Sequence, residues 1–266
     1  MNKRWIAAPF AAIAVAVPYF IAPKAETAYE NALAELNHYM DKMGFPVVVE
    51  RVGYKKGFLG SEAVSRIQLA RFLDDSSDPQ DCLDIVTEVN HGYGELLQGR
   101  WADTTTTIKP LSEQADCSLG MLYQEEQDFA DFYQQAFGAD GPAIINAHFK
   151  FNGATSIDYI TDSFHIDHQT EADSVKGHVT EMRGILDLNE ARDHVAIAID
   201  WPGFSLLLQS DADNVQVDLT HYSLTGDQQQ IYPYLWVGNG KQQVDGLTVQ
   251  DKGPGGTAFH LGSFML

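Results

Sequence analysis

Short alternating segments fill most of this chain after residue 46, and they constrain its fold more than any other feature. The segments are rich in β-branched residues, several alternate apolar with polar residues, and Gly, Asp, Asn or Pro separates one segment from the next. The clearest examples are VVVERV, CLDIVTEV, WADTTTTI, INAHFKF, HVAIAID, FSLLLQ and VQVDLTHYSL. The pattern is typical of a β-meander, so it predicts a mainly β (α+β) protein with an antiparallel, curved β-sheet.

Two segments carry helical spacing instead. Residues 24–43 place Ala, Leu, Tyr and Met on one stripe that Gly44 ends. The stripe predicts that an N-terminal membrane helix continues into a stalk helix whose outer part lies on the domain, with an amphipathic surface helix that does not dock as the alternative. Residues 124–138 carry an aromatic stripe that ends at Gly138. We interpret this stripe as core packing, with a ligand or partner surface as the alternative. A further short helix is expected over residues 227–236, although Pro233 weakens it.

The N-terminal residues 5–22 contain no charged side chain. As a helix they would span about 27 Å, close to the hydrocarbon thickness of a bilayer. The run is longer than the apolar part of a cleaved signal peptide, and the small-residue cleavage pattern is poor. We therefore predict an uncleaved signal-anchor over residues 1–22, with Lys3 and Arg4 in the cytoplasm, and an exported β-rich domain over residues 23–266.

The net charge limits which partners the protein can bind, and the two cysteines bear on its disulfide bonding. The formal net charge is −20, which repels phosphate, so nucleic acid is excluded as a partner. Lys3 and Arg4 are two of only 17 basic residues against 37 acidic ones, so the exported part should stand off an anionic membrane surface. Cys82 and Cys117 are the two cysteines, and outside the cytoplasm they predict one disulfide, with two free thiols as the alternative.

The stretch YKKGFLGSEAVSRIQL, residues 54–69, predicts a hairpin whose tight turn carries two bulky apolar side chains, Phe58 and Leu59. Gly57 and Gly60 give this turn its conformational freedom. A solvated turn would leave both side chains in water. We expect them to fold onto the sheet or onto the helix of residues 24–43, or else to form an exposed contact with a partner.

These segments resemble the bacterial YdgA-like family of exported, membrane-anchored proteins of unassigned function. The resemblance rests on the apolar run, the acidic helix and GFLGSEA, and continues in VNHGYG, FKFNGATSID and YLWVGNGKQQVDGLTV. Tyr93 departs from the pattern, where the family usually has Pro. The resemblance implies a single-pass protein of the inner membrane with its C-terminal domain in the periplasm.

The sequence contains few candidate reactive groups. In FHIDH a strand would place His165 and Asp167 on one face and His168 on the other, so at most two metal ligands converge. His91 begins a glycine turn, where a histidine more often bonds the backbone than acts as a base. The acidic segment DDSSDPQD, residues 74–81, lacks the ligand spacing of a calcium loop. No catalytic, cofactor-binding or metal-binding residue is therefore predicted.

Three functions are compatible with these features. The leading hypothesis is a membrane-anchored envelope protein that binds or scaffolds a partner, an unknown envelope protein, through its β-sheet surface without catalysis. The first alternative is a carrier of an apolar or lipid-like ligand in a groove of the curved sheet, lined by Phe204, Leu206, Leu208 and the aromatic residues of 129–137. The second alternative is a hydrolase or metal enzyme that uses His165 and Asp167.

Overall fold

The computed structural model describes residues 24–265 with the exception of 39, 43, 45–46, 70–81, 109–123, 125–126, 139–140, 170–172, 211–213, 233–234 and 254–255. The chain forms two compact units. Unit 1 comprises Met1–Glu125 and Asn146–Asn152, and unit 2 comprises Glu126–Ile145 and Gly153–Leu266. Antiparallel strands dominate both units, so the prediction of a mainly β protein is confirmed.

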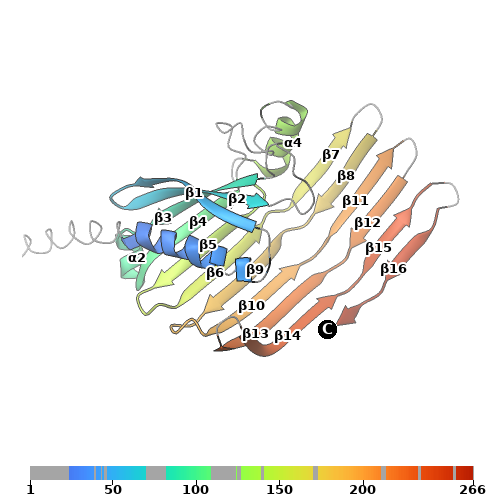
Figure 1. Ribbon diagram of the computed structural model, residues 1–266. Coiled ribbons are helices and arrows are strands. Elements are labelled where there is room, and N and C mark those ends of the chain that lie inside the picture. Colours follow the sequence, from blue (N-terminus) through green and yellow to red (C-terminus); the bar gives the residue numbers. More distant parts are fainter. Residues whose placement is uncertain are drawn as a thin grey trace, which may run out of the picture. The chain divides into compact units, whose positions relative to one another are not determined.

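Unit 1 contains an antiparallel sheet whose strands lie side by side in chain order (Figure 1). The strands are β1 (Val47–Lys56), β2 (Gly60–Leu69), β3 (Cys82–Asn90), β4 (Arg100–Ile108) and β5 (Ile144–Lys150), most of which belongs to this unit. A short helix, α2 (Tyr93–Leu97), connects β3 to β4. The sequence pattern indicated only a turn there, because five residues are too few to show helical periodicity.

An N-terminal helix, residues 24–38 and 40–42, packs on this sheet. Its first turn buries Ala25 against Val89 and Ala102. Near its other end, Asn37 Nδ2 donates to the carbonyl oxygen of Val49 at 2.8 Å, and the Val49 amide donates to Asn37 Oδ1 at 2.7 Å. The helix therefore runs along the β1–β2 hairpin, with its first turn beside the hairpin turn.

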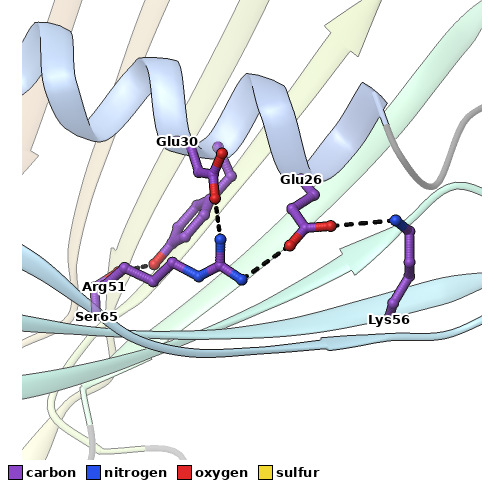
Figure 2. Close-up of polar contacts among 6 residues, drawn as sticks. Glu26, Glu30, Arg51, Lys56 and Ser65 are labelled. Atoms are coloured by element: carbon purple, nitrogen blue, oxygen red, sulfur yellow. Dashed lines mark hydrogen bonds and ion pairs between the residues drawn. The ribbon is translucent and has the colours of Figure 1, made fainter.

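Ion pairs join the same helix to β1 (Figure 2). Arg51 pairs with Glu26 at 2.9 Å and with Glu30, while Lys56 Nζ lies 3.2 Å from Glu26. Hydrogen bonds from Arg51 and then Lys56 hold the pKa of Glu26 below its ordinary value. Exposed pairs such as these contribute little free energy, so they fix the orientation of a helix that apolar burial holds in place.

No described helix is long and apolar enough to cross a membrane. The predicted anchor, residues 1–22, lies outside the described residues. The membrane anchor therefore stays a prediction.

The described residues of unit 2 form one helix, α4 (Gln127–Phe137), and two sets of six antiparallel strands. The first set has the order β6 (Thr155–Thr161), β9 (Met182–Leu188), β10 (His194–Trp201), β13 (Tyr222–Tyr232), β14 (Leu235–Val244) and β17 (Phe264–Met265). The second set has the order β7 (Phe164–Gln169), β8 (Asp173–Val179), β11 (Phe204–Ser210), β12 (Asn214–Leu219), β15 (Leu247–Asp251) and β16 (Ala258–Leu261).

The two sets are halves of the same six long strands. Each strand of one set continues into a strand of the other after two residues without strand structure, and Figure 1 shows the halves following one another. We call these interruptions the break line, which consists of residues 162–163, 180–181, 202–203, 220–221, 245–246 and 262–263. Hydrogen bonds join neighbouring interruptions, from the Thr180 amide to the Gly203 oxygen at 3.1 Å and from the Thr220 amide to the Gly246 oxygen at 2.9 Å.

The prediction of a helix over residues 227–236 is wrong, because the described residues of this range form strands. Residues 227–232 complete β13, and β14 begins at Leu235. Asp227 pairs with Ala196 of β10 on one side and with Asn239 of β14 on the other. Long-range pairing on both edges therefore outweighs the local preference of the glutamine-rich segment.

Candidate functional site

One face of the second set of strands is apolar across all six strands. In antiparallel strands directly opposed residues share a face, so the register identifies its members. The apolar residues of this face, which we call the apolar face, are Phe164, Ile166, Val175, Val179, Phe204, Leu206, Leu208, Val215, Val217, Leu219, Leu247, Val249, Phe259 and Leu261. The same register places His168 and Asp251 at its border.

The apolar face is not a closed core. Each of its side chains is half-buried or exposed, and Leu208 and Phe259 reach exposures of 43% and 59%. Sheets in soluble proteins normally cover an apolar face with another layer, and large uncovered patches mark binding surfaces. The face is therefore the strongest candidate for a binding site in the described part of the chain.

Helix α4 packs against one border of this face. The ring of Phe137 lies 4.8 Å from that of Phe164 on β7, and the ring of Phe132 lies 6.1 Å from that of His168. Tyr133, between them in sequence, is buried. The aromatic stripe thus packs on the same face that carries Phe204, Leu206 and Leu208, so the residues named for a ligand surface share one side of the second set.

The apolar character continues past the break line into the first set of strands. The rings of Trp201 and Phe204 lie 5.4 Å apart on either side of residues 202–203. On β10, Ile197 shares the face of Trp201 and stands opposite Leu186 of β9. Apolar residues therefore lie on both sides of the break line.

The opposite face of the second set is polar and carries the predicted pair His165 and Asp167. The rings of His165 and His178 stack at 4.3 Å, and Asp167 forms an ion pair with Lys176 at 3.5 Å. His168 points to the apolar side. Among the described residues no group of three or more His, Cys, Asp or Glu is placed to hold a metal ion.

His221 on the break line contacts two carboxylates. Its Nε2 lies 2.9 Å from Asp200 Oδ1, and its Nδ1 lies 3.0 Å from Asp245 Oδ2. Both ring nitrogens must donate to satisfy both contacts, so the geometry requires the protonated imidazolium. The hydrogen bonds to Asp200 and then Asp245 raise the pKa of His221. The charged ring thus joins the ends of β10 and β14 to the start of β13.

We predict that replacing His221 by Gln destabilises the protein more at low pH than at high pH. Because folding raises the pKa of His221, its contribution is complete below the ordinary value of about 6.5 and is lost as the pH rises through the folded-state value. Melting temperatures of wild type and His221→Gln, measured from about pH 5 to about pH 9, should converge at high pH. Asp200→Asn should remove part of this pH-dependent stabilisation, because Asp200 is one of the two carboxylates that contact His221. A difference in melting temperature that stays constant across this pH range would show that folding does not raise the pKa of His221.

In unit 1 the predicted turn residues Phe58 and Leu59 lie between β1 and β2 and are both about half exposed. The Leu59 carbonyl accepts a hydrogen bond from the His91 amide at 3.1 Å. The His91 side chain is fully buried, with Nε2 3.2 Å from Ser61 Oγ and no partner for Nδ1 among the described residues. Burial lowers the pKa of His91, so the ring stays neutral at neutral pH.

Two other sequence candidates fall mainly outside the described residues. Cys82 opens β3, but Cys117 is not described, so the disulfide between them stays a prediction. The acidic segment at residues 74–81 also lies in a part that the structure does not describe.

Comparison with known proteins places the chain in a family. The model of a bacterial family of unknown function, DUF945, matches residues 1–261. The chain belongs to the DUF945 family. Neither a curated protein nor a solved structure gives a significant match. Membership in DUF945 agrees with the expected resemblance to a bacterial family of unassigned function.

Two features of this DUF945 protein could not be seen in the sequence. Strand alternation predicted Leu206 and Leu208 on one face, but the extent of the apolar face depends on the register of six strands. The carboxylate contacts of His221 join residues 21 and 24 positions apart, and no local spacing indicates them.

Proposed function

We propose that this DUF945 protein is a membrane-anchored envelope protein with a non-catalytic binding role, and that it binds through the apolar face of unit 2. The observation that supports this proposal is an apolar face of six strands without a single fully buried side chain. The predicted anchor at residues 1–22 would hold the protein in the inner membrane, with unit 2 in the periplasm.

The chemistry of the face favours an apolar or lipid-like ligand. The backbone groups of its strands are engaged in the sheet ladders, and most of its side chains are aliphatic or phenyl groups without hydrogen-bond donors or acceptors; His168 and Asp251 are the polar exceptions at its border. A polar ligand would lose its hydrogen bonds to water without replacement, which is unfavourable. Alkyl chains lose none, and each buried methylene group contributes about 0.8 kcal/mol.

The enzyme alternative has less support. His165 and Asp167 share the polar face, but Asp167 is paired with Lys176 and His165 stacks on a second histidine. A hydrolase would need a nucleophile and a positioned base within hydrogen-bond reach of each other. The neighbouring His178 has no hydrogen-bond partner for Nδ1 among the described residues, and Ser205 beside it donates to Asp218 instead.

A pair of adjacent leucines on β11 tests the binding proposal. Leu206 lies on the apolar face, and Leu207, which is similarly half-buried, lies on the opposite face. Leu206→Asp should weaken the binding of a fluorescent polyene fatty acid by about tenfold or more, because a carboxylate would have to be desolvated beside the ligand. Leu207→Asp is the matched control and should bind like wild type.

The assay uses residues 24–266, and thermal melts establish that both variants are folded. Equal affinity of the two folded variants would show that the fatty acid does not occupy the apolar face.

A further inference from the structure

A second apolar surface lies at one end of unit 1. Five large apolar side chains there are exposed, although all of them occur in turns and connections rather than on a sheet face. They are Phe58, Leu59, Tyr93, Leu97 and Phe151, and we call them the apolar end. Leu97 is 89% exposed and Phe58 is 49% exposed, so neither serves as a core residue.

The strand order gathers these residues at one end. The β1–β2 turn carries Phe58 and Leu59, and the following β3–β4 connection on the same side contains α2. The Leu59 oxygen accepts from the first residue of that connection, His91, at 3.1 Å. The Phe151 amide, just after β5, donates to the oxygen of Gly99 at 3.3 Å. Figure 1 shows α2 and the hairpin turn at the same end of the unit.

The N-terminal helix begins at this same end. Lys56, two residues before Phe58, pairs with Glu26 at 3.2 Å, as Figure 2 shows. Ala25 packs against Val89, whose strand partner Ser61 directly follows the turn. The uncharged run of the sequence ends at Ala22. Even a fully extended chain spans at most about 14 Å from Ala22 to Glu26, so the apolar end lies close to the point where that run stops.

We propose that the apolar end rests in the surface of the lipid bilayer that holds residues 5–22. This inference relies on the membrane anchor of the proposed function. Phe, Tyr and Leu are residues that favour the region between headgroups and acyl chains. The arrangement also explains why a tight turn carries Phe58 and Leu59, since burial in lipid removes their apolar surface from water.

Burial of apolar side chains in the bilayer, and not attraction between lysines and anionic lipid, drives the contact of the apolar end with the membrane. The two lysines at the turn are paired, Lys55 with Glu62 at 3.1 Å and Lys56 with Glu26. The rest of this acidic protein is repelled by anionic lipid, so contact is confined to the apolar end. A zwitterionic bilayer is therefore the appropriate probe.

The test uses tryptophan variants of the full chain in phosphatidylcholine vesicles with brominated acyl chains. Phe58→Trp and Leu97→Trp place an indole at the apolar end. Because Leu97 is almost fully exposed, replacing it removes almost no buried apolar surface. Val48→Trp is the matched control, because Val48 is also exposed but pairs with Gln68 near the other end of β1. Val48 lies eight positions before Lys56 along β1, about 27 Å away.

After subtraction of the wild-type signal, quenching at positions 58 and 97 should exceed that at position 48 by at least about threefold, since interfacial side chains reach about 5–10 Å into the bilayer. If the protein floats with the vesicles but quenching is equal at positions 58, 97 and 48, the apolar end does not contact lipid, whereas the membrane anchor is still supported. Protein that does not float with vesicles would overturn both the anchor and this inference.

Discussion

Replacing Gly203 by Ala should abolish the stable fold of unit 2. Gly203 lies on the break line with φ of +114°, a backbone conformation that L side chains rarely adopt. An added Cβ would lie 1.9 Å from the carbonyl oxygen of Leu219, which is backbone and cannot rotate away. The carbonyl of Gly203 also accepts hydrogen bonds from both the amide and the hydroxyl of Thr180.

Backbone strain of this kind costs about 1–3 kcal/mol, and the steric clash adds to it. The sum is a large fraction of the roughly 5–15 kcal/mol that stabilises a typical domain, so we expect loss of the cooperative melt and rapid proteolysis. Gly138→Ala is the matched control, because Gly138 also has positive φ, +62°, but a Cβ added there would meet no atom within 4 Å. If both variants melt like wild type, Gly203 does not hold the strands at the break line.

The mainly β fold was predictable because strand alternation is a local signal. Phe204, Leu206 and Leu208 alternate with Ser205 and Leu207, and the structure places them as alternation requires. The aromatic stripe of α4 was equally clear, since Phe129, Phe132 and Tyr133 follow the helical period. Each of these predictions depends on fewer than about fifteen consecutive residues.

The pairing of strands and the two-residue interruptions were not predictable in the same way. Pro202 and Gly203 indicate a break in one strand, but Thr220 and His221 carry no such signal. The interruptions matter because they fall side by side in neighbouring strands, a relation that only the sheet register reveals. The exposure of Phe58 and Leu97 likewise depends on which elements pack against them, and for Phe58 the sequence left both cover by the domain and an exposed contact open.

We propose that the apolar face of unit 2 holds an apolar, lipid-like ligand in the cell, and two neighbouring residues of β11 allow a test. Leu208 and Gln209 are adjacent on β11 and both exposed, but they point to opposite faces of the sheet. A photoreactive benzoylphenylalanine at position 208 would therefore contact a bound ligand, whereas the same group at position 209 would face the polar side. Since crosslinking requires near contact, the difference between the two positions should be close to all or none.

The most direct measurement is in-cell photocrosslinking of the full chain at each of these two positions, followed by mass spectrometry of the purified protein. We predict that irradiation attaches an apolar molecule at position 208 and that position 209 gives no such adduct. Absence of an adduct at position 208, or the same adduct at both positions, would show that the apolar face does not hold an apolar ligand in the cell.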